Sequence, residues 1–431
     1  MTFRLDQRDA GFAAAFGDLL NARREQAADV ERAVAAIIAD VRRHGDVAVA
    51  EYTARFDRYA ARADALRLGR DEIAGAVARC DPEVRAALSF AAERIAAYHQ
   101  RQRPGDERWS DGAGVELGYR WTAIEAVGLY VPGGLAAYPS SVLMNAIPAR
   151  VAGVERLVMT VPTPDAVLNP QVLAAAESAG IDEIYRVGGA QAVAALAHGT
   201  ASIAAVAKIV GPGNAYVAAA KRQVFGTVGI DMIAGPSEVL ILADGDNDPA
   251  WIAADLLAQA EHDASAQSIL VSDDAGFAAA VEAAVEAQLE TLPRREIAGA
   301  SWRDYGAIIL VDKLDDAIGI VDRLAPEHLE IAASDAEALA RQVRNAGAIF
   351  LGRFSPEAVG DYVGGPNHVL PTARSARFSS GLNVLDFMKR TSILKCDAAA
   401  LRAIGPEAVT LARAEGLEAH ARSVALRLNL P

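Results

Sequence analysis

The feature that most constrains the fold of this sequence is the alternation of short apolar runs with alanine-rich segments of helical pattern. The alternation occupies residues 126–236, and a second block of the same kind spans residues 239–351. Strands that alternate with helices form parallel βαβ units, in which helices cover both faces of the sheet. We therefore expect two α/β lobes. Their strands are expected at 126–131, 156–161, 183–187 and 207–210, and near 239, 268, 307–310 and 348–350.

The flanking segments follow other patterns. Residues 9–102 have a helical period, and Asp81-Pro82 predicts a helix start because a capping side chain precedes a proline. Residues 105–125 alternate glycine with apolar residues, which predicts a hairpin. A polar, loop-rich stretch follows residue 352, and a terminal helix is expected from Pro406 through Leu426.

Length and charge exclude several classes of protein. The chain has 431 residues and a net charge of −14, so it is too long for one compact core and lacks the basic surface that nucleic acid or an anionic membrane would require. No apolar run reaches the roughly 18 residues of a membrane span, and no signal-peptide cleavage pattern is present, so a cytoplasmic location is expected. Cys80 and Cys396 form no CxxC motif and no disulfide framework. A metal here would take nitrogen and oxygen ligands.

Glycines stand where expected strands meet expected helices, at Pro132-Gly133-Gly134, Gly188-Gly189 and Gly211-Pro212-Gly213-Asn214. Glycine lets the backbone approach a ligand, and the amides of a helix N-terminus can bind an anion such as a pyrophosphate. Such turns also end strands in any α/β protein, and the last one misses the GxGxxG fingerprint. The turns leave both a nucleotide-type ligand and a purely structural role open.

Gln259 and His262 share one face of a segment that otherwise has the pattern of a buried helix. Asp248-Pro249 supplies an N-cap and a first helical residue, and apolar runs at 239–242 and 268–271 flank the helix as strands. An amide and an imidazole are ligand-type side chains, although open sheets seldom place ligands at this end of a helix. A surface helix end with an incidental histidine is the alternative interpretation.

Three further histidines lie in segments with candidate chemistry. His328 follows Glu327 in a tight turn, and such a pair can divide proton transfers between an imidazole and a carboxylate that activates water. A proline-started helix with an acidic first turn is the alternative there. His368 and Asp361 occupy loop-like positions, which often carry function. His420 lies on the terminal helix, where a solvated face is the alternative.

These segments, taken in order, resemble the histidinol dehydrogenase family across nearly the whole chain. The matching stretches are 127–134 with 138–149, 187–192, 209–217, 229–239, 259–263, 325–330, 361–371, 376–381, 386–392 and 414–420. The resemblance implies an NAD-dependent, zinc-containing oxidation of L-histidinol through L-histidinaldehyde to L-histidine, the last steps of histidine biosynthesis, with two NAD per turnover.

The resemblance also implies roles for individual residues. One zinc per subunit would be held by Gln259, His262, Asp361 and His420, a nitrogen and oxygen set that can stay open to substrate. His328 would be the base in both oxidations, and Glu327 would activate the water that attacks the aldehyde. Besides these residues, the substrate would contact Ser237, His368 and Glu415. The NAD-binding positions would be Tyr130, Gln191 and Asn214, in a family that binds its dinucleotide without GxGxxG.

The implied architecture agrees with the alternation: two incomplete Rossmann-like lobes with helical N-terminal and C-terminal extensions, in a homodimer. The expected divisions are an N-terminal helical arm (1–25), a first lobe with the metal and proton-transfer residues (26–129 plus 238–380), a second, NAD-binding lobe (130–237) and a C-terminal dimer-embracing segment (381–431). His420 and Glu415 would reach the active site of the partner subunit.

Two other functions compete with this one. A zinc hydrolase on an α/β scaffold would use Glu327 as general base, but it gives no reason for three glycine-rich junctions. A non-catalytic nucleotide-binding module would require a lost zinc or proton-transfer position, and the sequence retains all of them.

Overall fold

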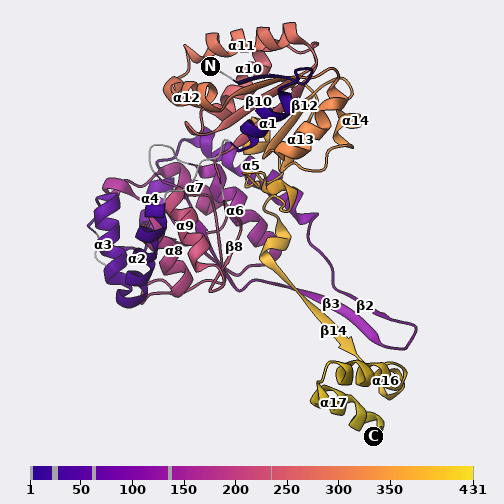
Figure 1. Ribbon diagram of the computed structural model, residues 1–431. Coiled ribbons are helices and arrows are strands. Elements are labelled where there is room, and N and C mark those ends of the chain that lie inside the picture. The colour runs from indigo at the N-terminus through magenta and orange to yellow at the C-terminus, as the bar shows by residue number, and fades with distance from the viewer. Residues whose placement is uncertain (1–2, 22–27, 61–64, 134–137, 234, 431) are drawn as a thin grey trace.

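The computed structural model describes residues 3–21, 28–60, 65–133, 138–233 and 235–430. Its two parallel sheets confirm the predicted α/β class, and Figure 1 shows an antiparallel ribbon that leads away from them to the C-terminal helices. Sheet A consists of β1 (Phe3–Asp6), β9 (Glu238–Ala243), β10 (Gln267–Ser272), β11 (Ala307–Leu310), β12 (His328–Ala332) and β13 (Ala348–Leu351). Sheet B consists of β4 (Ala126–Tyr130), β5 (Arg156–Thr160), β6 (Glu183–Tyr185), β7 (Lys208–Val210) and β8 (Gly229–Ile230).

Both sheets are doubly wound around a buried central strand. Sheet A has the order β1-β11-β10-β9-β12-β13, and sheet B has the order β6-β5-β4-β7-β8. In each, the chain moves outward from β9 or β4 and then resumes on the other side of that strand. Every residue of β9 and β4 is buried, as expected for strands with both faces covered. The order places a switch point between β9 and β12 and another between β4 and β7.

The helices divide between the two sheets. Sheet A carries α1 (Phe12–Asn21), α10 (Pro249–Ala260), α11 (Ala275–Leu289), α12 (Arg295–Tyr305), α13 (Ile318–Leu324) and α14 (Ala336–Ala340). The lobe of sheet B contains α2 (Ala28–His44), α3 (Asp46–Asp57), α4 (Arg70–Val77), α5 (Pro82–Gln100), α6 (Pro139–Ala152), α7 (Pro170–Ser178), α8 (Gly189–His198) and α9 (Ala215–Val224). The predicted starts of α5 and α10 are confirmed, because Asp81 and Asp248 cap them with a proline at the first position.

Two features of the N-terminal quarter differ from the prediction. Residues 28–60 and 65–100 pack on the lobe of sheet B, whereas the sequence predicted them to belong to the lobe of sheet A. The apolar period of α2 predicts a buried face, but it cannot say which sheet that face covers. Residues 3–6 form an edge strand that pairs in parallel with β11, within an arm predicted to be helical. The predicted boundary after residue 25 lies outside the described residues.

The C-terminal segment leaves the two lobes. β2 (Glu107–Ser110) and β3 (Glu116–Ala123) form the predicted hairpin, and β14 (Met388–Lys395) pairs antiparallel along the whole of β3. This ribbon ends in α16 (Ala398–Ala414) and α17 (Glu418–Leu428), which stand apart from both sheets in Figure 1. The prediction of one helix from Pro406 through Leu426 is wrong. Gly416, with φ at +73°, separates two helices, and Pro406 lies inside the first.

None of the helices described is both long enough and apolar enough to cross a membrane.

Candidate active site

The predicted proton-transfer pair lies at the amino end of β12. Ala325 ends α13 in the left-handed conformation, and the chain then turns through Pro326 and Glu327 so that His328 opens the strand. Glu327 is 5% exposed and His328 is 4% exposed. The predicted tight turn is confirmed, and the alternative of a helix start at this point is wrong.

His328 is surrounded by carboxyl groups. Its Nδ1 lies 3.1 Å from the backbone carbonyl oxygen of Glu238, 3.7 Å from Glu357 Oε2 and 3.8 Å from Glu327 Oε2. Its Nε2 lies 3.7 Å from Asp361 Oδ1 and has no hydrogen-bond partner among the described residues. A carbonyl oxygen only accepts hydrogen bonds, so the contact with Glu238 requires the proton on Nδ1. Nε2 is therefore the nitrogen free to accept a proton.

Three of the four predicted metal ligands gather beside this pair. Gln259 lies in the last turn of α10, His262 follows the end of that helix, and Asp361 lies on α15 (Glu357–Tyr362), which packs against α10. His262 Nε2 is 3.9 Å from Asp361 Oδ2. Gln259 is 0% exposed, and neither polar atom of its amide has a partner in the described part of the chain. A buried amide without partners is costly unless it binds a ligand, so this donor set fits a metal ion.

The fourth predicted ligand lies elsewhere in the same chain. His420, on α17, and the predicted substrate contact Glu415, at the end of α16, are both exposed at the far end of the ribbon (Figure 1). In the described ranges, no cluster of three or more His, Cys, Asp or Glu side chains could hold a metal. Of the four predicted ligands, His262 and Asp361 are of those types and lie close together.

The two other predicted substrate contacts lie beside the site. His368 Nδ1 is 3.0 Å from the carbonyl oxygen of Asp361, and its Nε2 is 3.5 Å from the Ser141 hydroxyl of α6. Ser237 precedes β9, next to Glu238, and its carbonyl accepts a hydrogen bond from Gln267. Because α6 follows the carboxyl end of β4, the contact with Ser141 joins the site to the lobe of sheet B.

The predicted cofactor positions lie at the carboxyl edge of sheet B, near its switch point. Tyr130 ends β4, and its hydroxyl oxygen accepts a hydrogen bond from the amide of Gly189 at 3.1 Å. Gln191 is 1% exposed on α8, and both atoms of its amide lack a partner in the described ranges. Asn214 caps α9 by accepting hydrogen bonds from Tyr216 and Val217. An edge of this kind is where doubly wound sheets bind nucleotides, although Gly134 of the first predicted turn lies outside the described residues.

A buried ion pair holds the turn that leads to Asn214. Gly211 has φ at +113°, and a Cβ there would lie 2.1 Å from the carbonyl oxygen of Tyr130, so only glycine fits. Asp231 accepts a hydrogen bond from the Gly211 amide at 2.8 Å, and Lys221 donates one to its carbonyl at 3.0 Å. Lys221 and Asp231 form a salt bridge, with side chains 3% and 1% exposed. The pair holds both backbone polar groups of Gly211 beside Tyr130.

The environment shifts the pKa values of the central groups in different directions. Burial raises the pKa of Glu327 to about 7, which exceeds the opposing effect of His328. Burial lowers the pKa of His328, but the facing carboxyls of Glu357, Glu327 and Asp361 outweigh it and raise the pKa well above the usual value. Burial raises the pKa of Asp361, but contacts with His328 and His368 outweigh it and give a net decrease. Such opposed shifts are typical of sites that transfer protons.

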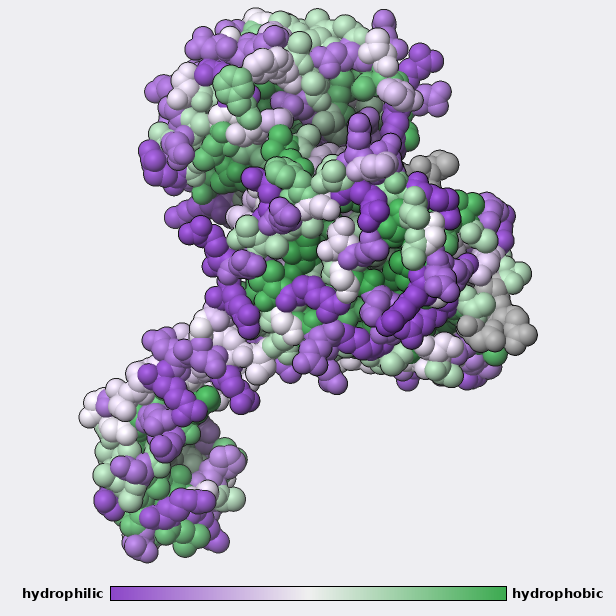
Figure 2. All heavy atoms as spheres, turned by 180° about the vertical axis from the view of Figure 1, so that it is seen from behind, coloured by the Kyte–Doolittle hydropathy of each residue, from purple (hydrophilic) through white to green (hydrophobic). Residues whose placement is uncertain are grey.

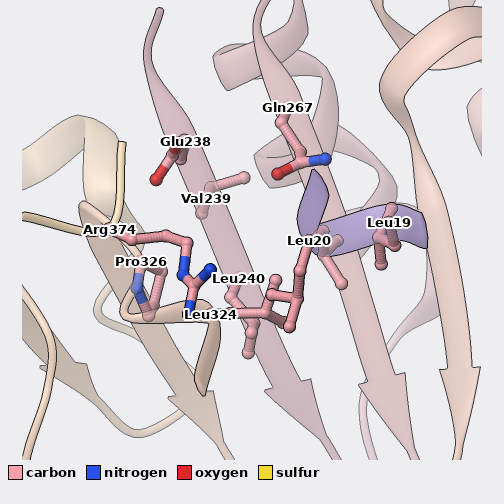
Figure 3. A pocket seen from close by; sticks show the side chains of 10 residues that line it. Leu19, Leu20, Glu238, Val239, Leu240, Gln267, Leu324, Pro326 and Arg374 are labelled. Carbon is pink, nitrogen blue, oxygen red and sulfur yellow. The ribbon is translucent and has the colours of Figure 1, made fainter. Parts of the chain in front are cut away.

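A pocket opens beside the pair at the amino ends of β9 and β10. Figure 3 shows Glu238, Gln267 and Arg374 among its lining side chains, with Pro326 next to Arg374. The backbone amide of Glu238 donates to Glu327 Oε2 at 2.9 Å, while its carbonyl contacts His328. Glu238 therefore separates this pocket from the catalytic pair.

Three carboxyls of the site, two of them buried and one half-buried, were not predicted from the sequence. They follow from the same periodicities that relate Gln259 to His262, because residues four apart share a helix face and residues two apart share a strand face. Asp255 lies four residues before Gln259, Glu357 four before Asp361, and Glu330 two after His328.

The doubly wound sheets and the buried Glu–His pair where the lobes meet define an α/β enzyme with proton-transfer chemistry. The profile of the histidinol dehydrogenase family matches residues 20–428. The chain is 67% identical to a histidinol dehydrogenase of Rhodospirillum rubrum, over 100% of this chain and 99% of that one. It is also 67% identical to one of Bradyrhizobium diazoefficiens, over 100% of both. The crystal structure of histidinol dehydrogenase from Elizabethkingia anophelis superimposes with a TM-score of 0.95 at 36% identity, covering 99% of this chain and 98% of that one.

The chain therefore belongs to the histidinol dehydrogenase family. Its activity is that of an oxidoreductase acting on histidinol in histidine biosynthesis. This result excludes the zinc hydrolase and the non-catalytic module as readings of the sequence.

Proposed function

We propose that the enzyme oxidises L-histidinol in two steps, through L-histidinaldehyde to L-histidine, with two NAD as hydride acceptors and one zinc ion per subunit. The observation that carries the proposal is the position of the buried pair Glu327–His328 beside Gln259, His262 and Asp361. A proton-transfer pair next to a set of metal-type donors, one of which is a buried amide without a partner among the described residues, suits an oxidation in which the substrate is held by a metal.

Gln259, His262 and Asp361 would hold the zinc ion together with His420 of a second subunit. The amide oxygen, imidazole and carboxylate are ligand types that zinc accepts, and Gln259 brings an amide with no other partner among the described residues. When bound, zinc would supply a positive charge and a fixed point that orients the substrate. Burial lowers the pKa of His262, which favours the neutral imidazole that binds metals.

His328 would act as the base in both oxidations. The carbonyl of Glu238, 3.1 Å from Nδ1, fixes the ring so that Nε2 carries the lone pair. Nε2 would take the hydroxyl proton of the alcohol, and later that of the aldehyde hydrate, as the hydride leaves carbon for the nicotinamide. The facing carboxyls raise the pKa of His328, so they stabilise the protonated form of the ring.

Glu327 would remove a proton from the water that adds to the aldehyde. Its pKa of about 7, raised by burial, lies near the range in which a carboxylate is both ionised and a useful base. The backbone amide of Glu238 donates to its Oε2 and orients the carboxyl. This role belongs to the second oxidation only, because the first consumes no water.

NAD would bind at the carboxyl edge of sheet B, with Tyr130, Gln191 and Asn214 as contacts. The unpartnered amide of Gln191 and the close-packed glycine at position 211 support a ligand that lies against the backbone. The contact between Ser141 and His368 joins this edge to the proton-transfer pair. The hydride acceptor and the base would then act on one substrate between the lobes.

A homodimer would complete the site. Glu415 and His420 lie on a ribbon-borne pair of helices that extends away from its own lobes, and Figure 2 shows apolar side chains at the surface of this unit. Exposed side chains there include Leu411 at 65% and Leu426 at 75%. Such an extension fits an arm that reaches a second copy of the chain. The location in the cytoplasm remains a prediction.

The stoichiometry of NADH formation tests the proposal. L-histidinol at a limiting concentration, with excess NAD and zinc, should yield two NADH per histidinol, and the product should be L-histidine. One NADH per histidinol with an aldehyde product would contradict the second oxidation and the role of Glu327. Activity that persists unchanged after zinc has been removed and verified absent would contradict the metal site.

A further inference from the structure

Three carboxyl groups, two of them buried and one half-buried, form a second layer behind the catalytic site. Each projects from the same face of its element as a site residue, because the spacing is four on a helix or two on a strand. The pairs are Asp255 with Gln259 on α10, Glu330 with His328 on β12, and Glu357 with Asp361 on α15. The roles proposed above do not use this layer.

Glu357 is the member of the layer that contacts the proposed base. It is 1% exposed, and its Oε2 lies 3.7 Å from His328 Nδ1 with no hydrogen-bond partner among the described residues. The Glu330 carboxyl accepts a hydrogen bond from the backbone amide of Glu357 at 2.5 Å, and it shares a side-chain hydrogen bond with Asp255. One of those two carboxyls must carry a proton for that bond to form. A series of contacts therefore connects His328, through Glu357 and Glu330, to the half-buried Asp255.

The layer places negative potential on one side of His328. The charges that act most strongly on Glu357 are those of His328 and of other carboxyls, so the imidazole is its main opposite charge. Burial raises the pKa of Glu357 to about 8, and the positive charge of His328 is the main effect that opposes this increase. A protonated His328 would supply that counter-charge. The two groups therefore stabilise each other when the imidazole is positive.

We propose that Glu357 is a positioning residue for His328: its carboxyl faces Nδ1 at 3.7 Å and offsets the positive charge that His328 gains during oxidation, while the Glu238 carbonyl holds the ring. This inference rests on the proposed role of His328 as base. In each oxidation the substrate O–H bond breaks and its proton passes to Nε2. The C–H bond breaks, its electron pair leaves with the hydride for NAD, and a C=O bond forms. The imidazolium remains beside Glu357 until it returns the proton to water. Glu330 and Asp255, which share a proton, support Glu357 from behind.

The test is the substitution Glu357→Gln, which keeps the size of the side chain and prevents it from ionising beside His328. We expect kcat to fall about 100-fold, as for loss of assistance to a general base, while KM for L-histidinol and the zinc content stay near the wild-type values. The solvent isotope effect on kcat should increase, because proton transfer to His328 becomes slower. Glu357→Asp should recover part of kcat. Asp244→Asn is the matched control: Asp244 pairs with Arg353 at the opposite edge of sheet A, and its loss should not change the isotope effect.

The outcomes separate this inference from the proposed function. A wild-type enzyme that forms no NADH from histidinol would overturn both. An active wild type with a Glu357→Gln variant of equal kcat and isotope effect would overturn the positioning role alone. If Glu357→Gln melts well below the wild type, Glu357→Asp decides: partial recovery of kcat supports the role. A kcat as low as that of the Gln variant, at a wild-type melting temperature, contradicts it.

Discussion

The unpartnered amide of Gln259 predicts that this residue lowers the stability of the zinc-free protein and increases its affinity for zinc. Gln259 is fully buried, and both polar atoms of its side chain lack a partner among the described residues. A buried polar group without a partner costs about 1–3 kcal/mol. Gln259→Met keeps the length of the side chain and removes both atoms. We therefore expect the zinc-free variant to be more stable than the zinc-free wild type by about 1–3 kcal/mol.

With zinc present, the wild type should be more stable than the Gln259→Met variant. Zinc binds only the folded protein and stabilises it by about 2.7 kcal/mol at a hundred times its dissociation constant. The variant has lost one ligand, so it should gain much less from the same zinc concentration. For a lobe of this size the zinc-free difference corresponds to a rise in melting temperature of about 2–12 °C.

The assay is thermal denaturation of both proteins with a chelator and with added zinc, together with the metal content after dialysis. Gln191→Met is the control, because Gln191 is the other buried amide of the predicted sites with no partner among the described residues. It should leave the zinc-dependent shift intact. A Gln259→Met variant that is less stable without zinc, or that keeps the full zinc-dependent shift, would refute the assignment of Gln259 as a metal ligand.

Three further predictions concern the rest of the site. Lys221→Met should destabilise the protein by about 3–5 kcal/mol and raise KM for NAD, because it leaves Asp231 buried and unpaired. In a melting experiment, a double variant that adds Asp231→Leu should recover much of the lost stability. Strictly additive losses in the double variant would contradict the pairing. Glu327→Gln should keep its zinc and slow the aldehyde step more than the alcohol step, which single-turnover kinetics from either substrate would measure; equal slowing would contradict the water-activating role. The pKa of Glu357, raised to about 8 by burial, adds stability that is fully present below the unfolded pKa of about 4.5 and is lost as pH rises toward 8. The stability of Glu357→Gln relative to the wild type should therefore increase from pH 5 to pH 8, and a decrease in chemical denaturation would contradict the sign.

Local chemistry made part of the fold predictable. Asp81 and Asp248 cap helices at the positions expected, and the apolar runs became strands in two doubly wound sheets. A run of buried residues or a capping side chain acts over one turn of the chain, so a sequence displays it directly. The sequence does not display which surface a helix packs against. The amphipathic period of α2 predicts that it packs, but nothing in that period selects the lobe of sheet B.

The residues of the site likewise divide into those that local sequence pattern predicts and those that depend on packing between distant segments. Gln259 and His262 were visible as a pair because they share one helix face, and Asp361 joined them only through the family resemblance. Glu357 and Glu330 stood in the sequence as ordinary acidic residues, since their burial depends on how α15 meets β12. The exposed position of His420 fits the proposed homodimer, in which a second chain would supply its neighbours. Packing between distant segments, rather than local pattern, decides these features.

A mixed-dimer experiment tests the shared metal site most directly. Subunits with His262→Asn and subunits with His420→Asn should each be inactive alone. If the arm of one subunit completes the site of the other, random mixing after verified subunit exchange makes half of the dimers hybrid, with one intact site each. Activity and bound zinc should then return to about a quarter of the wild-type values. No recovery in a mixture that demonstrably contains hybrids would contradict the account, because it would mean that each site is built within a single chain.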